Sequence, residues 1–120
     1  MRAIGNAFEQ RACAELERAG LKLLARNYNT RFGELDLVML DGDTIVFVEV
    51  RYRKHSAHGD AAASVTASKR TKLIKAAEFW LAENPKRANS ICRFDIFTYD
   101  GLPENARGTW LCDAFDANRI

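Results

Sequence analysis

Two acidic residues, Asp36 and Glu49, lie where two neighbouring strands would bring them together. Both flank a segment with the composition of a tight hairpin turn, and side chains alternate between the two faces of a strand. If the turn is a two-residue loop, Asp41 pairs with Thr44, and counting back places Asp36 directly opposite Glu49. Their Cβ atoms would then be about 5 Å apart. A register two residues shorter leaves them diagonal neighbours, and a slip of one residue separates them.

Two carboxylates at this spacing repel each other, and the apolar strands around them make the loss of hydration costly. A divalent cation offsets both effects. Mg²⁺ takes one or two carboxylates together with water and phosphate oxygens. Such an ion lowers the pKa of a water molecule and stabilises the charge on phosphorus during in-line displacement. The acidic pair therefore indicates metal-dependent chemistry on phosphate esters.

Arg51 follows Glu49 by two residues and so shares its face of the strand. A guanidinium can hold a phosphate or neutralise developing charge, but it stays protonated and cannot act as a general base. The alternative is a solvated sheet edge in which Asp36 or Glu49 simply pairs with Arg51 or Arg53. Against it, Glu49 lies inside an apolar run, and ionisable residues are seldom buried without a partner or a metal.

A basic segment follows at once, although the whole chain has a net charge of only +2. Residues 51–75 hold seven Lys or Arg against one acid, Asp60. A local excess of this kind favours a polyanion such as nucleic acid, because phosphate contacts release counterions. A solvated helix face is the alternative for any isolated basic run.

The helices and strands that would position these residues are predicted from the spacing of apolar residues and from the residues that begin or end each element. Asn6 and Glu9 have the spacing of a capping box at the start of a helix. Thr66 or Ser68 can cap a second helix, which Asn84 and Pro85 end. Residues 55–65, with His55 and His58, have no convincing period and predict a mobile connection. The predicted helices cover residues 7–19 and about 67–83; the predicted strands cover residues 21–28, 34–40, 44–53 and 91–99, with a short edge strand at 110–115.

This order, αβββαβ with a further strand, predicts a single α/β domain over residues 1–120, with helices on both faces of a mixed sheet. The 120 residues are 48% hydrophobic and 28% charged, which excludes disorder and collagen-like structure. No apolar run is long enough to span a membrane, so we expect a cytoplasmic protein without membrane contacts. Three cysteines without a C-x-x-C pair argue against a disulfide framework and a cysteine zinc site.

Several stretches of the chain resemble the YraN family of predicted endonucleases. They are GELDLV at 33–38, FVEVRYR at 47–53, residues 65–69 and RFD at 93–95. That family is similar to the archaeal Holliday-junction resolvases within the PD-(D/E)xK, restriction-endonuclease-like superfamily. The resemblance spans roughly residues 5–115 and is more specific than the D…ExK spacing alone.

The resemblance implies a restriction-endonuclease-like fold and assigns roles to individual positions. Asp36 and Glu49 match the metal-binding acids, and Glu9 matches an acid that the resolvase-like branch carries on its first helix. Arg51 stands at the lysine position of the superfamily, and Lys69 falls at a basic position that opens the second helix. On helix criteria alone Glu9 is a capping acid, and Glu34 is either a supporting acid or a solvated strand start.

The sequence thus predicts a Mg²⁺- or Mn²⁺-dependent endonuclease acting on DNA, with Asp36, Glu49 and Arg51 as catalytic residues. Branched or structured DNA and a twofold dimer are implied by the resemblance alone. Two alternatives stay open: a non-catalytic nucleic-acid-binding module on a nuclease scaffold, and a protein-interaction domain with structural carboxylates. The residues predicted to contact the DNA backbone are Arg53, Lys54, Lys69, Arg70 and Lys72.

Overall fold

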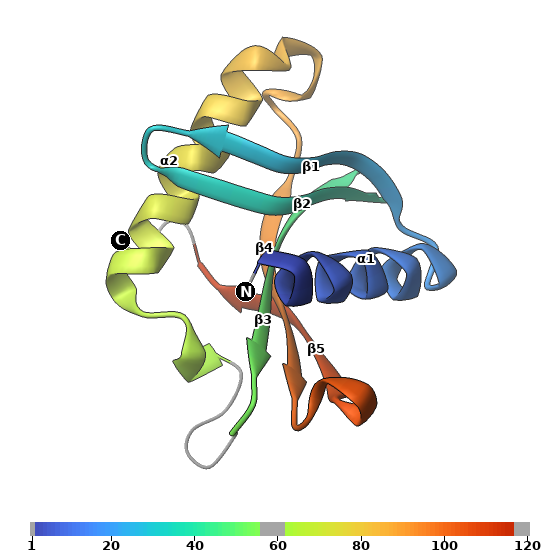
Figure 1. The fold of residues 1–120 in the computed structure, drawn as a ribbon. Coiled ribbons are helices and arrows are strands. Elements are labelled where there is room, and N and C mark those ends of the chain that lie inside the picture. The colour runs from blue at the N-terminus through green and yellow to red at the C-terminus, as the bar shows by residue number, and fades with distance from the viewer. Residues whose placement is uncertain (1, 56–61, 117–120) are drawn as a thin grey trace.

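The described part of the chain folds into two helices and five strands, with three short 3-10 turns, arranged as in Figure 1. The computed structural model describes the backbone of residues 2–55 and 62–116. The elements are α1 (Arg2–Arg18), β1 (Lys22–Thr30), β2 (Gly33–Asp41), β3 (Thr44–Arg53), η1 (Ala62–Ser64), α2 (Ala67–Glu83), η2 (Pro85–Arg87), β4 (Cys92–Asp100), η3 (Pro103–Asn105) and β5 (Arg107–Phe115).

The strands form one mixed sheet in the order β1-β2-β3-β4-β5. β3 and β4 run parallel, as expected of two strands joined through a helix, and the other neighbours are antiparallel. The predicted α/β class and element order are therefore confirmed. β3 occupies the centre of the sheet, and its run Ile45 to Glu49 is buried, which explains its nearly continuous hydrophobicity.

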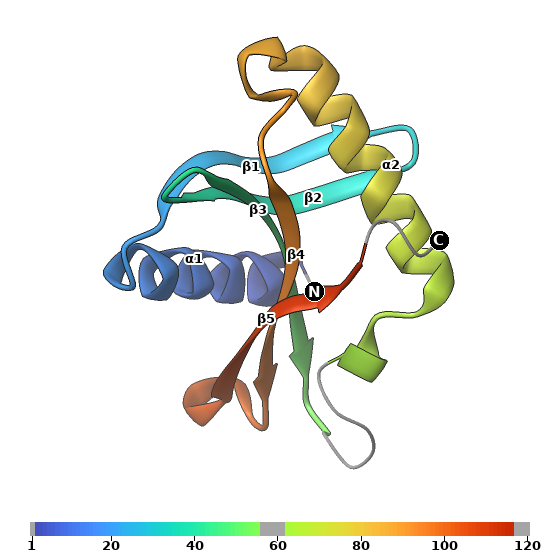
Figure 2. The same cartoon turned by 180° about the vertical axis from the view of Figure 1, so that it is seen from behind.

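The helices lie on opposite faces of the sheet, each over its own core (Figures 1 and 2). Phe8, Ala12 and Leu16 of α1 pack with alternate residues of β3 and β4, such as Val46 and Phe97. The stripe of α2 that contains Leu73, Ala76, Ala77 and Trp80 packs on the other face with Phe47, Phe94 and Ile96. Each helix can thus deliver a side chain to the sheet from its own side.

The predicted ends of most helices and strands lie within a few residues of those observed, but the predicted start of α1 is wrong. Thr66 caps α2, and its side chain accepts a hydrogen bond from the backbone N–H of Lys69 at 3.2 Å, as predicted. The predicted capping box at Asn6 is wrong, because the helix already begins at Arg2. An Asn-x-x-Glu pattern does not mark a helix start when the preceding residues continue the helical backbone. β5 begins at Arg107, three residues before the predicted edge strand.

The predicted connection at residues 55–65 falls mostly on residues 56–61, including His58, which lie outside the described part of the chain. His55 is exposed. None of the described helices is long and apolar enough to cross a membrane. All three cysteines have free thiols, in agreement with the expectation from their number and spacing.

Candidate active site

The β2–β3 hairpin has the register that the sequence predicts. Asp41 pairs with Thr44, and the ladder continues back to the pair Leu37 and Val48. Beyond that pair the two strands stop pairing, and β2 continues alongside β1 alone. The Oδ2 atom of Asp36 accepts a hydrogen bond from the backbone N–H of Val50 at 2.9 Å. The side chain of Asp36 therefore spans the point where the central strands diverge.

Four carboxylates gather at this point, and we call them the acidic cluster: Glu9, Glu34, Asp36 and Glu49. Glu9, Glu34 and Asp36 each offer an oxygen within 4.8 Å of the others. Glu49 joins them as the neighbour of Asp36, whose charge acts on it. One acid comes from α1, two from β2 and one from β3. The predicted pairing of Asp36 with Glu49 is thus part of a larger group.

Three acids of the cluster are buried, and Glu34 is half-buried. Glu9, Asp36 and Glu49 are 8%, 9% and 5% exposed. The Oε1 atoms of Glu9 and Glu49 are buried without a hydrogen-bond partner among the described residues. A buried carboxylate oxygen without a partner is costly. The cluster therefore has oxygen atoms free to bind a ligand that carries positive charge.

Burial and mutual repulsion shift the protonation of two of these acids. Burial first, and then the charge of Asp36, together raise the pKa of Glu49 to about 8 against the opposing effects of Lys69 and Arg51. Burial, followed by the charges of Asp36 and Glu34, raises the pKa of Glu9 to about 7. Without a cation, the cluster therefore holds protons near neutral pH.

Two cations flank Glu49. The Lys69 Nζ atom, from the first turn of α2, lies 3.8 Å from Glu49 Oε2. The Arg51 Nη1 atom lies at the same distance from this oxygen. Their side chains are 36% and 39% exposed, so each reaches from the buried acid toward solvent. The structure thus brings together five residues that the sequence analysis singled out for different roles: Asp36, Glu49, Glu9, Arg51 and Lys69.

The other predicted phosphate contacts separate into two kinds. The guanidinium of Arg53 binds Asp100 through two hydrogen bonds of 2.7 and 3.1 Å. Arg70 donates a hydrogen bond from Nε to the carbonyl of Val65 at 3.0 Å, and its guanidinium lies over the ring of Phe115. These contacts connect the first turns of α2 to the residue before its cap and to β5. Lys54 and Lys72 are exposed. Of these four, the two lysines are the accessible cations.

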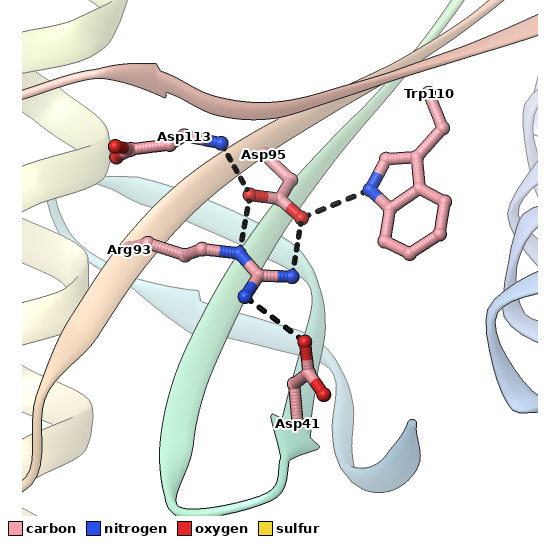
Figure 3. A network of polar contacts seen from close by, with 5 residues as sticks. All are labelled: Asp41, Arg93, Asp95, Trp110 and Asp113. Atoms are coloured by element: carbon pink, nitrogen blue, oxygen red, sulfur yellow. Dashed lines mark hydrogen bonds and ion pairs between the residues drawn. The ribbon is translucent and has the colours of Figure 1, made fainter. Parts of the chain in front are cut away.

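The sequence allows Glu34 either a supporting or a solvated role, and the structure places one of its oxygens within 4.8 Å of oxygens of Glu9 and Asp36. Its alternation with Asp36 on one strand was the available signal. Asp95, by contrast, lies in a separate polar network with Arg93, Trp110 and Asp113 (Figure 3).

The acidic cluster fits a divalent cation. Mg²⁺ and Mn²⁺ prefer oxygen ligands, and the cluster presents carboxylates alone, two of them with unpartnered buried oxygens. A cation would remove the repulsion that raises the pKa values of Glu9 and Glu49. The adjacent Lys69 and Arg51 leave a positive surface beside the cluster, where a phosphate can bind.

Comparison with known proteins identifies one family and several relatives that carry its name. Residues 8–98 match the model of the family described as "Uncharacterised protein family UPF0102". A UPF0102 protein of Ectopseudomonas mendocina (strain ymp) is 53% identical over 115 residues, covering 95% of both chains. One from Pseudomonas aeruginosa (strain LESB58) is 50% identical over 115 residues, covering 94% of this chain and 92% of the relative. One from Pseudomonas fluorescens is 49% identical over 114 residues, covering 94% and 93%.

Proposed function

We propose that this chain, which belongs to the UPF0102 family, is a metal-dependent endonuclease that hydrolyses DNA in the cytoplasm. The observation that supports the proposal most is the convergence of four acids from α1, β2 and β3, with two of their oxygens buried and unpartnered, beside Lys69 and Arg51. A purely structural cluster of acids would be expected to satisfy these oxygens within the fold.

Asp36, Glu49 and Glu9 would hold the cation, with Glu34 as a further oxygen donor. Bound Mg²⁺ or Mn²⁺ supplies Lewis acidity, which activates water and neutralises charge on the phosphate. Asp36 is held by the N–H of Val50, so one of its oxygens is oriented before any ligand arrives. Glu49 is held from the other side by two cations.

Lys69 can supply what Arg51 lacks. Arg51 occupies the strand position beside Glu49, where its permanent charge can hold the phosphate but cannot exchange a proton. The Lys69 ammonium reaches the same glutamate oxygen from α2, and an ammonium can lose a proton. We therefore assign phosphate stabilisation to Arg51, and proton transfer or water positioning to Lys69.

The accessible lysines extend the site toward a DNA backbone. Lys72 lies one turn beyond Lys69 on α2, and Lys54 follows the end of β3. Each can contact a phosphate, whereas Arg53 and Arg70 are engaged within the fold. A branched substrate cut by a twofold dimer extends this proposal, since paired cuts need two copies of the site.

The test is cleavage of supercoiled plasmid and of a four-way junction by purified protein with Mg²⁺ or Mn²⁺. Asp36→Asn and Glu49→Gln should abolish cleavage while circular dichroism shows an intact fold. Glu17→Gln, on an exposed position of α1, is the matched control and should cut normally. Wild-type protein that never cuts would overturn the proposal. Salt-sensitive DNA binding that persists in chelator would then indicate a binding module, and no binding at all an interaction domain.

A further inference from the structure

An aromatic pair, of which Phe79 is exposed and Phe32 half-buried, lies at one edge of the molecule. Phe32, in the turn between β1 and β2, and Phe79, on α2, lie with ring centroids 5.5 Å apart and planes tilted by 40°. Phe79 is 41% exposed. The rings line an open cavity of about 260 Å³ with Lys75, Glu78 and Ala82. Neither ring is among the members of the two cores, whereas the adjacent Trp80 is buried.

Cations surround the aromatic pair. The Arg31 guanidinium lies 5.0 Å from the centre of the Phe32 ring and 6.0 Å from that of Phe79. The Lys75 ammonium lies 5.4 Å from the centre of the Phe32 ring. Exposed aromatic rings interleaved with Arg and Lys are the chemistry that binds single-stranded nucleic acid: bases stack on the rings and phosphates contact the cations.

The aromatic pair is connected to the acidic cluster along α2. Lys69, Lys72 and Lys75 follow one another at intervals of three residues, and Lys69 contacts Glu49. At 1.5 Å per residue, Lys75 lies about 9 Å farther along the helix than Lys69. A Cβ built on Gly33 would lie 3.9 Å from the Cβ of Lys72, so the β1–β2 turn rests against the middle of this row. A single nucleic-acid strand could therefore contact both the aromatic pair and the acidic cluster.

We propose that Phe32 and Phe79 form a stacking site for an unpaired nucleobase, on a strand whose phosphates follow Lys72 and Lys75 away from the acidic cluster. The path of the strand rests on the proposed function. The inference deepens that function by naming the substrate class: DNA with a single-stranded segment near the cut. A base within a duplex has both faces stacked on its neighbours and cannot occupy the site.

Glu78 distinguishes a base from a phosphate as the occupant of the cavity. Its carboxylate lies in the same lining as the two rings and would repel a phosphate there. It can instead accept a hydrogen bond from an N–H group on a base edge. We therefore assign the phosphates to Lys72 and Lys75, and the base to the rings of Phe32 and Phe79.

The experiment compares two oligomers with the same phosphates: fifteen-nucleotide oligothymidylate and its fully abasic analogue. Binding is measured by fluorescence anisotropy at low salt in chelator, so that no cleavage occurs. Wild-type protein should bind oligothymidylate more tightly. Phe79→Ala should weaken this binding about 5- to 150-fold, the range found for loss of one stacked base, and leave the abasic oligomer unaffected. Phe79→Trp should keep the preference for bases.

Ile91→Ala is the matched control, because Ile91 is an exposed apolar residue, 75% exposed, outside the cavity. It should change neither affinity. Phe32→Ala should weaken oligothymidylate binding in the same way as Phe79→Ala. Because Phe32 is not on α2, agreement between the two variants would show that the loss does not come from a local change in that helix. The stacking site is overturned if wild-type protein fails to distinguish the oligomers, or if Phe79→Ala weakens both equally or neither. Plasmid cleavage without a base preference would overturn this inference alone, whereas a base preference in a protein that never cuts would overturn only the nuclease.

Discussion

Asp36 and Val50 are joined where the central strands diverge: the carboxylate Oδ2 accepts the backbone N–H at 2.9 Å. Asp36 lies one residue, and Val50 two residues, beyond the last β2–β3 pair. Asp36 therefore has two functions that substitution can separate. Its negative charge serves the proposed metal site, while its acceptor oxygen satisfies a backbone donor that the ladder leaves without a strand partner.

Asp36→Asn and Asp36→Ala should consequently differ in stability. Asparagine keeps a carbonyl acceptor for Val50 and removes a charge from the acidic cluster, so the metal-free variant should be at least as stable as wild type. Alanine leaves the N–H unpaired, and we expect it to be less stable than the asparagine variant by about 1–3 kcal/mol. Urea unfolding in chelator measures both. Equal stability of the two variants would show that the hydrogen bond contributes little.

The raised pKa values of Glu9 and Glu49 predict how metal-free stability depends on pH. Their ordinary pKa is 4.5, and in the folded protein it is about 7 for Glu9 and about 8 for Glu49. The folded state therefore binds more protons than the unfolded state within this window. Stability from these groups is complete below about pH 4.5 and is lost as pH rises toward 8.

The measurement is the melting temperature in chelator from pH 5 to pH 8, compared between wild type and Glu49→Gln. The substitution should raise the melting temperature at pH 8 and flatten the profile, whereas the exposed Glu17→Gln should not. Saturating Mn²⁺ should stabilise wild type more at pH 8 than at pH 5, because protons compete with the cation. A parallel decline in wild type and Glu49→Gln would contradict the assignment.

Substitution of Lys69 separates charge from proton transfer. If the ammonium takes part in proton transfer, Lys69→Arg should lower the cleavage rate about as much as Lys69→Met, by roughly 10²–10⁴-fold. If Lys69 only neutralises charge, arginine should restore most of the rate. Single-turnover cleavage between pH 6 and 9 distinguishes the two, and Lys72→Met, which removes an exposed lysine one turn away, is the control for weakened DNA binding.

The network around Asp95 should be a main source of stability, independent of the site. Asp95 is fully buried and accepts hydrogen bonds from Arg93, from Trp110 Nε1 and from the backbone N–H of Asp113 (Figure 3). Asp95→Ala leaves these donors without their acceptor and should cost roughly 3–5 kcal/mol.

Asp113→Asn is the matched control for Asp95. It keeps the backbone donor, and asparagine tolerates the positive φ of 52° at this position. Its effect on urea unfolding should stay within about 0.5 kcal/mol. A loss of less than 1 kcal/mol in Asp95→Ala would show that the network is not the source of stability that its burial indicates.

Local signals were sufficient to predict the hairpin that supports the acidic cluster. The short turn fixed the pairing of Asp41 with Thr44, and the strict alternation of a strand then carried the register toward Asp36 and Glu49. α2 was likewise predictable from Thr66 and its apolar stripe.

The remaining features depended on tertiary structure. Alternation along one strand places Glu34 on the same face as Asp36, but no local pattern in the sequence indicates that β2 stops pairing with β3 at Leu37 and continues beside β1 alone. The sequence predicts Arg53 and Arg70 as phosphate contacts, but both donate hydrogen bonds within the fold. Arg53 binds Asp100 on the parallel strand β4, and Arg70 binds the carbonyl of Val65. The early start of α1 was missed because an apparent capping pattern lay inside the helix.

The helices on opposite faces of the sheet contribute to the same site: α1 supplies Glu9 to the acidic cluster, and α2 supplies Lys69 beside it. A chain in which either layer has come loose would lack one of these groups. Detachment of α1 would remove a ligand of the cation, and detachment of α2 would remove the ammonium beside Glu49. Cleavage activity should therefore appear only after both helices have docked on the sheet.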